Sequence, residues 1–251
     1  MPRAKKTTEN TTFSNVKAKR LRKKKPINTE MMVDIKPLTP SQEKVFEYWN
    51  DKKNLFMYGA AGTGKTFVAL YLALNEVLKN DSPYEKVYIV RSLVSTREIG
   101  FLPGDHEDKS YLYQIPYTNM VRYMFEMPDD NSFEMLYGNL KAQETISFWS
   151  TSFIRGTTLD RSIVIVDECQ NLNFHELDSI ITRVGEDTRI IFCGDANQTD
   201  LVKTNERNGI HNFMNILRLM NEFGMVEFGI EDIVRSGLIR SYLLNKIALG
   251  F

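Results

Sequence analysis

Cysteine and histidine are scarce in this chain, which limits the metal and redox chemistry it can support. Among 251 residues there are two cysteines, Cys169 and Cys193, and three histidines. They form no C-x-x-C pair and no cluster at metal-ligand spacing, so the sequence offers no metal site built from thiolate and imidazole groups. Both cysteines stand in or beside apolar runs, which predicts buried structural thiols.

Long apolar runs are absent as well. The chain contains no stretch of about 18 apolar residues, the length that a membrane-spanning helix needs. Its first residues are basic and polar and lack the apolar core of a secretory signal. We therefore expect a soluble, cytoplasmic protein without a membrane segment. The composition is that of a globular domain with an appendage.

The chain has no net charge, but its charges are unevenly distributed. Residues 1–25 hold ten of the 32 Lys and Arg residues and one of the 32 Asp and Glu residues, so this stretch carries +9 and the remainder −9. A basic arm on an acidic body favours attraction to a polyanion such as nucleic acid. The alternative is a solvated extension that aids solubility or docks on a neighbouring subunit. Because apolar residues are few here, we predict that residues 1–34 form a disordered basic tail.

For residues 35–251 we predict one α/β domain with a mostly parallel sheet. Apolar runs of strand length alternate with segments of helical periodicity, as in parallel strands joined by helices. Asn173 and Glu176 predict a capped helix start, and Gly185 and Gly224 stand where two helices are expected to end. Residues 96–138 contain three prolines and several tyrosines and predict an irregular insertion. The predicted strands cover residues 54–58, 86–91, 145–149, 162–166, 189–193 and 225–228.

One segment matches the phosphate-binding pattern G-x-x-x-x-G-K-[ST]. It follows the apolar run 55–58 and opens a predicted helix over 67–78, which is the context that this loop requires. Glycines let successive backbone N–H groups point inward at phosphates, and the helix N-terminus adds positive potential. We expect Lys65 to reach the β- and γ-phosphates of ATP and Thr66 to bind Mg²⁺. The loop comprises Gly59, Ala60, Ala61, Gly62, Thr63, Gly64, Lys65 and Thr66.

Two further strand ends carry polar groups suited to ATP hydrolysis. The apolar run 163–166 ends in Asp167 and Glu168, which predicts a carboxylate for the magnesium shell and one that polarises the attacking water. The run 190–193 leads into residues 194–198, where Gln198 can sense the γ-phosphate or that water. All three segments are expected at the carboxyl edge of the sheet. The alternatives are a strand capped by solvated acids and, for 194–198, a simple turn.

Taken together, these motifs resemble superfamily 1 helicase motor domains and, more closely, PhoH-like ATPases. The likeness covers residues 38–245 and rests on four segments beside the P-loop. They are I-G-F-L-P-G at 99–104, F-I-R-G-T-T-L at 153–159, D-E-C-Q-N at 167–171 and D-I-V-R at 232–235. This chain departs from the family pattern at Ala60, Cys169, Ala196-Asn197 and Ser236-Gly237, and the last departure bears on the setting of Arg235.

The resemblance implies a RecA-like P-loop domain and roles for four more residues. Gln42 matches the glutamine that contacts adenine, although Thr39, Pro40 and Gln42 also make a helix N-cap. Arg235 resembles an arginine finger, which stabilises charge on the departing γ-phosphate, and a surface arginine is the alternative. Arg91 and Arg155 are candidates to meet the γ-phosphate or a nucleic-acid backbone.

These inferences predict an ATP-hydrolysing protein, either a nucleic-acid-dependent ATPase or an RNA helicase or remodeller acting on single-stranded RNA or DNA. A homo-oligomeric ring or hexamer would let Arg235 reach the ATP of a neighbour. Four tyrosines and one arginine are candidates to stack on bases, with simple packing as the alternative. A nucleotide-gated nucleic-acid-binding scaffold with little hydrolysis is the second hypothesis. The stacking candidates are Tyr111, Tyr113, Tyr117, Tyr123 and Arg122.

Overall fold

A six-stranded sheet forms the centre of the molecule in the computed structural model, which describes residues 26–91, 106–154, 156–195 and 204–249. The strand order is β3-β2-β4-β5-β1-β6, and all five neighbouring pairs are parallel. The predicted α/β class with a mostly parallel sheet is confirmed, and each predicted strand is found within two residues of its expected limits. The strands are β1 (Asn54–Gly59), β2 (Lys86–Arg91), β3 (Ile146–Ser150), β4 (Ser162–Asp167), β5 (Arg189–Gly194) and β6 (Phe223–Phe228).

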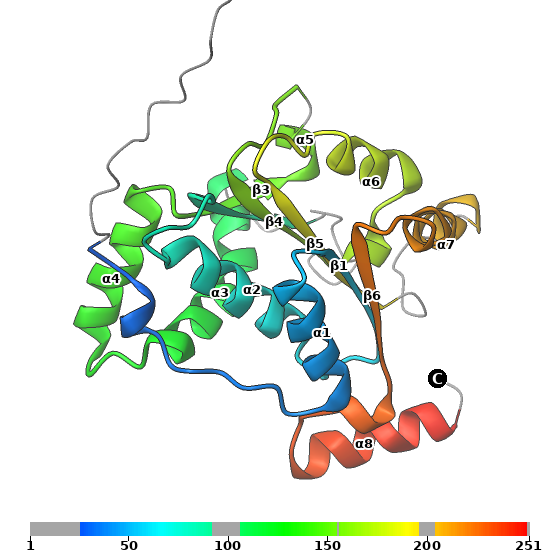
Figure 1. Cartoon of the computed structure of the whole chain (residues 1–251). Helices are drawn as coiled ribbons and strands as arrows, with labels where there is room; N and C mark the ends of the chain where they lie inside the picture. The colour runs from blue at the N-terminus through cyan, green and yellow to red at the C-terminus, as the bar shows by residue number, and fades with distance from the viewer. Residues whose placement is uncertain (1–25, 92–105, 155, 196–203, 250–251) are drawn as a thin grey trace, which may run out of the picture.

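Helices cover both faces of this sheet (Figure 1). Side chains of β4 alternate between the two cores: Ile163 and Ile165 pack with α1 to α4, whereas Val164 and Val166 pack with α6 and α7. Burial on both faces explains why β4 and β5 are continuous apolar runs rather than alternating ones. The helices are α1 (Pro40–Asn50), α2 (Lys65–Leu78), α3 (His106–Phe125), α4 (Asp130–Ala142), α5 (Thr151–Ile154), α6 (Phe174–Ile181), α7 (Thr204–Arg218) and α8 (Gly237–Ala248).

The described residues include 26–34, which the sequence assigned to the tail. Thr29–Met31 form a 3-10 helix capped by Asn28, and Ile27 is buried in the core. The backbone N–H of Val33 donates to the carbonyl oxygen of Met124 at 2.8 Å. Burial of Ile27 and the backbone hydrogen bond to α3 tie this segment to the domain, whereas the predicted tail extends to residue 34. Residues 1–25 lie outside the described part of the chain.

Two of the predicted helix ends are wrong. The predicted capping box of Asn173 and Glu176 is present at the start of α6, but that helix ends at Ile181, because residues beyond it pair with the segment around Leu159. Gly224 lies inside β6, beyond the end of α7. A Cβ atom there would lie 2.4 Å from the ring of Tyr48, so this glycine allows α1 to pack closely on β6.

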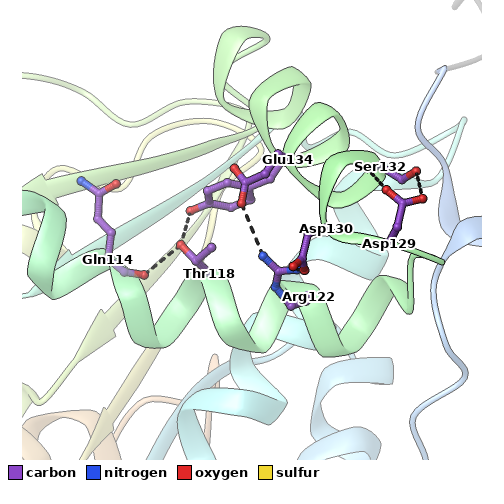
Figure 2. Close-up of polar contacts among 8 residues, drawn as sticks. Gln114, Thr118, Arg122, Asp129, Asp130, Ser132 and Glu134 are labelled. Carbon is purple, nitrogen blue, oxygen red and sulfur yellow. Dashed lines mark hydrogen bonds and ion pairs between the residues drawn. The ribbon is translucent and has the colours of Figure 1, made fainter.

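The predicted irregular insertion is a helical hairpin where the structure describes it. Over residues 106–138 the chain forms α3, with Pro116 inside it, and most of α4. Figure 2 shows the polar contacts that join the two helices. Thr118 donates to the hydroxyl of Tyr137 at 3.1 Å, and Arg122 forms ion pairs with Asp130 and Glu134. The prolines and tyrosines suggested a loop, whereas packing against α2 and α4 stabilises a helix.

Candidate functional site

The P-loop lies between β1 and α2 and has the backbone shape that the sequence predicts. Gly59 and Gly62 adopt φ angles of 117° and 77°, in the region that favours glycine. A Cβ atom on Gly59 would lie 2.2 Å from the carbonyl oxygen of Phe228, the paired residue in β6. Glycine is therefore required here both by the dihedral angle and by the close approach of the neighbouring strand.

Lys65 is folded into this loop. Its Nζ atom donates to the carbonyl oxygens of Gly59 and Ala60, at 2.9 and 2.7 Å, and to the hydroxyl of Thr63 at 3.3 Å. Burial lowers the pKa of the Lys65 ammonium group, and the nearby acidic groups, Asp195 among them, oppose that shift. The charged group therefore lies at the cavity wall and is held by oxygen acceptors that a phosphate can replace.

Thr66 and Asp167 meet across the site. The hydroxyl of Thr66 donates to Oδ1 of Asp167 at 2.8 Å, joining the start of α2 to the end of β4. Hydroxyl and carboxylate oxygens suit Mg²⁺, so these two residues fit the ion that the sequence predicts. Within the described ranges no group of three or more His, Cys, Asp and Glu side chains could hold a metal.

The second oxygen of Asp167 is bonded to a residue for which the sequence predicted no such role. The hydroxyl of Tyr117, from α3, donates to Oδ2 of Asp167 at 2.6 Å. Burial raises the pKa of the Asp167 carboxyl group, and the hydrogen bonds from Tyr117 and Thr66 oppose that rise. Burial, followed by the charge of Asp167, also raises the pKa of the Tyr117 phenol far above its usual range. Tyr117 therefore stays a neutral donor.

The stacking candidates have different surroundings in the structure. Tyr117 is enclosed at 2% exposure, so of the two alternatives for this residue the structure supports packing rather than stacking on bases. Arg122 pairs with α4 and lies over the Phe133 ring, and Tyr113 lies beneath the Arg91 guanidinium group. Tyr123 is exposed beside Phe67 and stays a candidate. The side chain of Tyr111 lies outside the described residues.

Glu168 turns sharply out of β4. Its backbone is left-handed, with φ 51° and ψ 40°, and its half-exposed carboxylate reaches the same cavity. Gln170 was not predicted as a site residue, although its Nε2 atom donates to Glu168 at 2.6 Å and its Oε1 atom accepts from the N–H of Asp195 at 3.0 Å. This amide joins the ends of β4 and β5, and Arg91 lies 4.0 Å from the other oxygen of Glu168.

Gln42 ties α1 to the P-loop. Its Oε1 atom accepts from the N–H of Leu38 at 2.8 Å, and its Nε2 atom donates to the carbonyl oxygen of Thr63 at 3.1 Å. Thr39 caps α1 and Pro40 stands in the first turn, so that part of the prediction is confirmed. Gln42 also lines an apolar cavity of about 680 Å³ beside the P-loop, and its contact with adenine stays a prediction.

Arg235 lies against the P-loop of its own chain. The N–H of Val234 donates to the carbonyl oxygen of Gly62 at 3.2 Å, and a Cβ atom on Gly62 would lie 3.1 Å from Cγ of Arg235. The exposed Arg235 side chain lines one cavity of about 310 Å³ with Lys65 and Asp167 of its own chain. Its role as an arginine finger, and whether it serves this site or that of a neighbour, stay predictions. Gln198 and Arg155 lie outside the described residues.

Three strand ends meet at this cavity, as the sequence predicts. It is lined by residues 61–66 after β1, by Asp167 and Glu168 at the end of β4, and by Gly194 and Asp195 at the end of β5. Cys169 and Cys193 are free and buried nearby, as predicted, and burial raises the pKa of both thiols.

The model of the family described as PhoH-like protein matches residues 34–245. This chain belongs to the PhoH family.

Relatives of this PhoH-family chain extend beyond the matched region. The protein PhoH of Escherichia coli is 29% identical over 215 residues, which cover 84% of this chain and 58% of the relative. A PhoH-like protein of Synechocystis is 32% identical over 186 residues, covering 74% of this chain and 54% of the relative. The chain thus spans somewhat over half the length of these two proteins.

Solved structures that the PhoH-family chain resembles include a bacteriophage large terminase and a helicase. The large terminase of a thermophilic bacteriophage, in complex with ADP, has a TM-score of 0.46 and 13% identity over 84% of this chain and 50% of the other. Unliganded Pif1 from Bacteroides sp has a TM-score of 0.39 and 18% identity over 85% of this chain and 46% of the other. Among the described residues, no helix is long and apolar enough to cross a membrane.

Proposed function

We propose that this PhoH-family chain is a magnesium-dependent ATPase whose turnover is stimulated by single-stranded RNA or DNA. The observation that carries the proposal is the hydrogen bond between Thr66 and Asp167, which unites the P-loop with the acidic end of β4. Lys65 and Glu168 line the same cavity, so phosphate-binding and water-activating groups stand together. Paired carboxylates favour hydrolysis over transfer to a second substrate.

In this proposal, each residue of the site has a distinct role. The backbone N–H groups of residues 59–64 and the ammonium group of Lys65 hold the β- and γ-phosphates. Thr66 and Asp167 would hold Mg²⁺, which would neutralise charge on the phosphate oxygens. Glu168 orients a water and accepts its proton as the water oxygen bonds to the γ-phosphorus and the bridging oxygen leaves with ADP. Gln170 holds the Glu168 carboxylate in place.

The remaining groups account for charge and for the base. Arg235 supplies a positive charge to the departing γ-phosphate from within the same chain. The larger cavity, lined by Leu38, Phe67 and Tyr123 among others, has the apolar and aromatic walls that a purine needs, and Gln42 stands at its edge. An adenine base in that cavity leaves its triphosphate directed at the P-loop, because the two cavities share Gly62 and Gly64.

Two finer parts of the proposal rest on other observations. Stimulation by nucleic acid is supported by the +9 charge of residues 1–25 and by the sequence likeness to helicase motor segments. Assembly into a homo-oligomeric ring or hexamer is supported by α8, where Leu238 and Tyr242 are 85% and 64% exposed. Light scattering during turnover tests assembly, and an active monomer contradicts it.

ATP hydrolysis measured with single-stranded RNA, with single-stranded DNA and with no polymer tests the function directly. The full chain and a variant lacking residues 1–25 are compared at several salt concentrations. We expect polymer to raise turnover, and loss of the basic stretch to weaken binding and flatten its salt dependence while basal turnover persists. Equal rates in every condition contradict the nucleic-acid part of the proposal.

The Glu168→Gln variant separates hydrolysis from the scaffold alternative. If Glu168 activates water, this variant binds ATP as tightly as the natural chain and loses about 100-fold or more in turnover. A scaffold that hydrolyses slowly without this carboxylate keeps its turnover unchanged, and that result would remove the hydrolytic mechanism.

A further inference from the structure

Both oxygens of the Asp167 carboxylate are held by hydroxyl donors from different parts of the fold. Thr66 donates to Oδ1 at 2.8 Å and Tyr117 donates to Oδ2 at 2.6 Å. Thr66 belongs to the P-loop helix, whereas Tyr117 belongs to α3 in the segment between β2 and β3. One donor therefore comes from the nucleotide-binding motif itself and the other from a helix that carries no part of that motif.

Burial makes the hydrogen bond between Tyr117 and Asp167 important for the orientation of the carboxylate. The exposed fractions of Tyr117 and Asp167 are 2% and 5%, so little water is available to replace a lost donor. A hydrogen bond to a buried charged acceptor is stronger than one between neutral groups, and leaving such an acceptor unpaired costs more than the bond itself contributes. Without the phenol, the Thr66 hydroxyl remains as donor to Oδ1, and rotation of the carboxylate about its Cβ–Cγ bond is less restrained.

The position of the Tyr117 hydroxyl is fixed by its surroundings. Its ring packs against Phe148 of β3, with ring centroids 5.5 Å apart. The next residue, Thr118, donates to Tyr137 of α4, and Arg122 one turn further along α3 is paired with acidic residues of α4 (Figure 2). The α3–α4 hairpin and β3 thus hold the phenol where it meets Asp167, so the tyrosine is a rigid donor rather than an adaptable one.

We propose that Tyr117 is a positioning residue, which sets the orientation of the Asp167 carboxylate for Mg²⁺ bound with ATP. The inference rests on the proposed function in taking Asp167 as the metal-holding carboxylate, and it adds a residue outside the nucleotide-binding motifs. Groups that orient a metal-holding side chain typically change metal affinity or activity by about 10–100-fold when they are removed. Tyr117 does not touch the nucleotide in this scheme; its hydroxyl also meets Arg91, and its effect on Mg²⁺ passes through Asp167.

The test is the Mg²⁺ dependence of ATP binding in the Tyr117→Phe variant, which loses the hydroxyl and keeps the buried ring. A fluorescent ATP analogue is titrated against the full chain, first with EDTA and then over a series of Mg²⁺ concentrations. We expect affinity in EDTA to stay within about twofold of the natural chain, since the phosphates still meet the P-loop. The Mg²⁺ concentration for half-maximal enhancement is expected to rise about 10-fold.

Tyr84→Phe is the matched control, because it removes the hydroxyl of another buried tyrosine just before β2, at the edge of the sheet opposite Asp167. Its Mg²⁺ dependence is expected to equal that of the natural chain, and circular dichroism checks that both variants fold. An unchanged Mg²⁺ dependence in Tyr117→Phe overturns the proposal, as does an equal loss of binding in EDTA, which marks a general structural role. If Mg²⁺ fails to enhance binding even in the natural chain, the metal assignment of Asp167 fails together with this inference. Failure of hydrolysis alone, seen with Glu168→Gln, leaves the binding result intact.

Discussion

The Nε2 atom of Gln170 lies 2.6 Å from Oε2 of Glu168, and the same side chain accepts a hydrogen bond from the backbone of Asp195. A single amide therefore spans the ends of β4 and β5 and holds the carboxylate that we assign to water activation. Glu168 has a left-handed backbone and a half-exposed side chain, and Gln170 makes a shorter contact with it than Arg91, which lies 4.0 Å from its other oxygen. In the proposed mechanism, orientation of the attacking water depends on this restraint.

The Gln170→Ala variant is expected to lower kcat by roughly 10-fold to 100-fold, since small misplacement of a catalytic group has effects of that size. KM for ATP is expected to stay near its natural value, because Lys65 and the P-loop backbone are unchanged. Steady-state ATP hydrolysis measures both constants. Gln143→Ala, at the exposed C-cap of α4, is the control with the same chemical change. A rise in KM at unchanged kcat contradicts the assignment of Gln170.

Arg235 offers a test of action within one chain. Because it packs on the P-loop of its own chain, Arg235→Ala is expected to reduce kcat by about 1000-fold, the lower end of the range for arginine fingers. Mixing this variant with Lys65→Ala distinguishes the two arrangements. An arginine acting within its own chain leaves the mixture inactive, whereas recovery of turnover upon mixing shows that the arginine of one chain serves the ATP of another.

Asp167→Asn is expected to stabilise the nucleotide-free protein while removing its response to Mg²⁺. Burial raises the pKa of the Asp167 carboxyl group above its usual 3.8, so the folded state at neutral pH carries a buried charge that the unfolded state solvates freely. The free energy that this buried charge costs the folded state is fully present above the raised pKa of the folded state. It disappears below the pKa of Asp167 in the unfolded state. The variant should therefore unfold at a higher temperature than the natural chain at pH 7, with the difference shrinking as pH falls.

Differential scanning calorimetry over pH 4 to 8, with and without MgATP, measures both effects. Each kcal/mol of stabilisation corresponds to roughly 2–4 °C for a chain of this size. A lower unfolding temperature for Asp167→Asn at pH 7 shows that the hydrogen bonds from Thr66 and Tyr117 outweigh desolvation. In that case the pKa of the Asp167 carboxyl group is not raised in the folded state, and the direction that we assign to its pKa shift is wrong.

Two Gly→Ala changes should have opposite effects on stability. Gly59→Ala is expected to cost at least about 2 kcal/mol, because its Cβ atom meets the carbonyl oxygen of Phe228 at 2.2 Å and its φ angle is 117°. Gly138→Ala, inside α4 with no atom within 4 Å of the added carbon, is expected to stabilise by about 0.5–1 kcal/mol. Urea denaturation compares them, and equal effects refute the steric explanation of Gly59.

The P-loop and the acidic end of β4 were predictable because each consists of residues that are adjacent in the sequence. A strand, a glycine turn and a helix start follow one another within residues 54–66, and backbone geometry at each step depends on local sequence. The buried strands were equally legible, since burial on both faces leaves continuous apolar runs. The hairpin of α3 and α4 was not, because Pro116 and the tyrosines around it are loop signals when tertiary packing is unknown.

The sequence by itself determined the order of the strands along the chain, the P-loop and the identity of the two carboxylates. Only the tertiary structure decided which partners these groups have. Tyr117 meets Asp167 across 50 residues, and Thr66 meets it across 101. Arg235 joins the loop from the far end of the domain. No local periodicity or spacing encodes such meetings, because they arise where the order of the strands brings distant segments to one edge of the sheet.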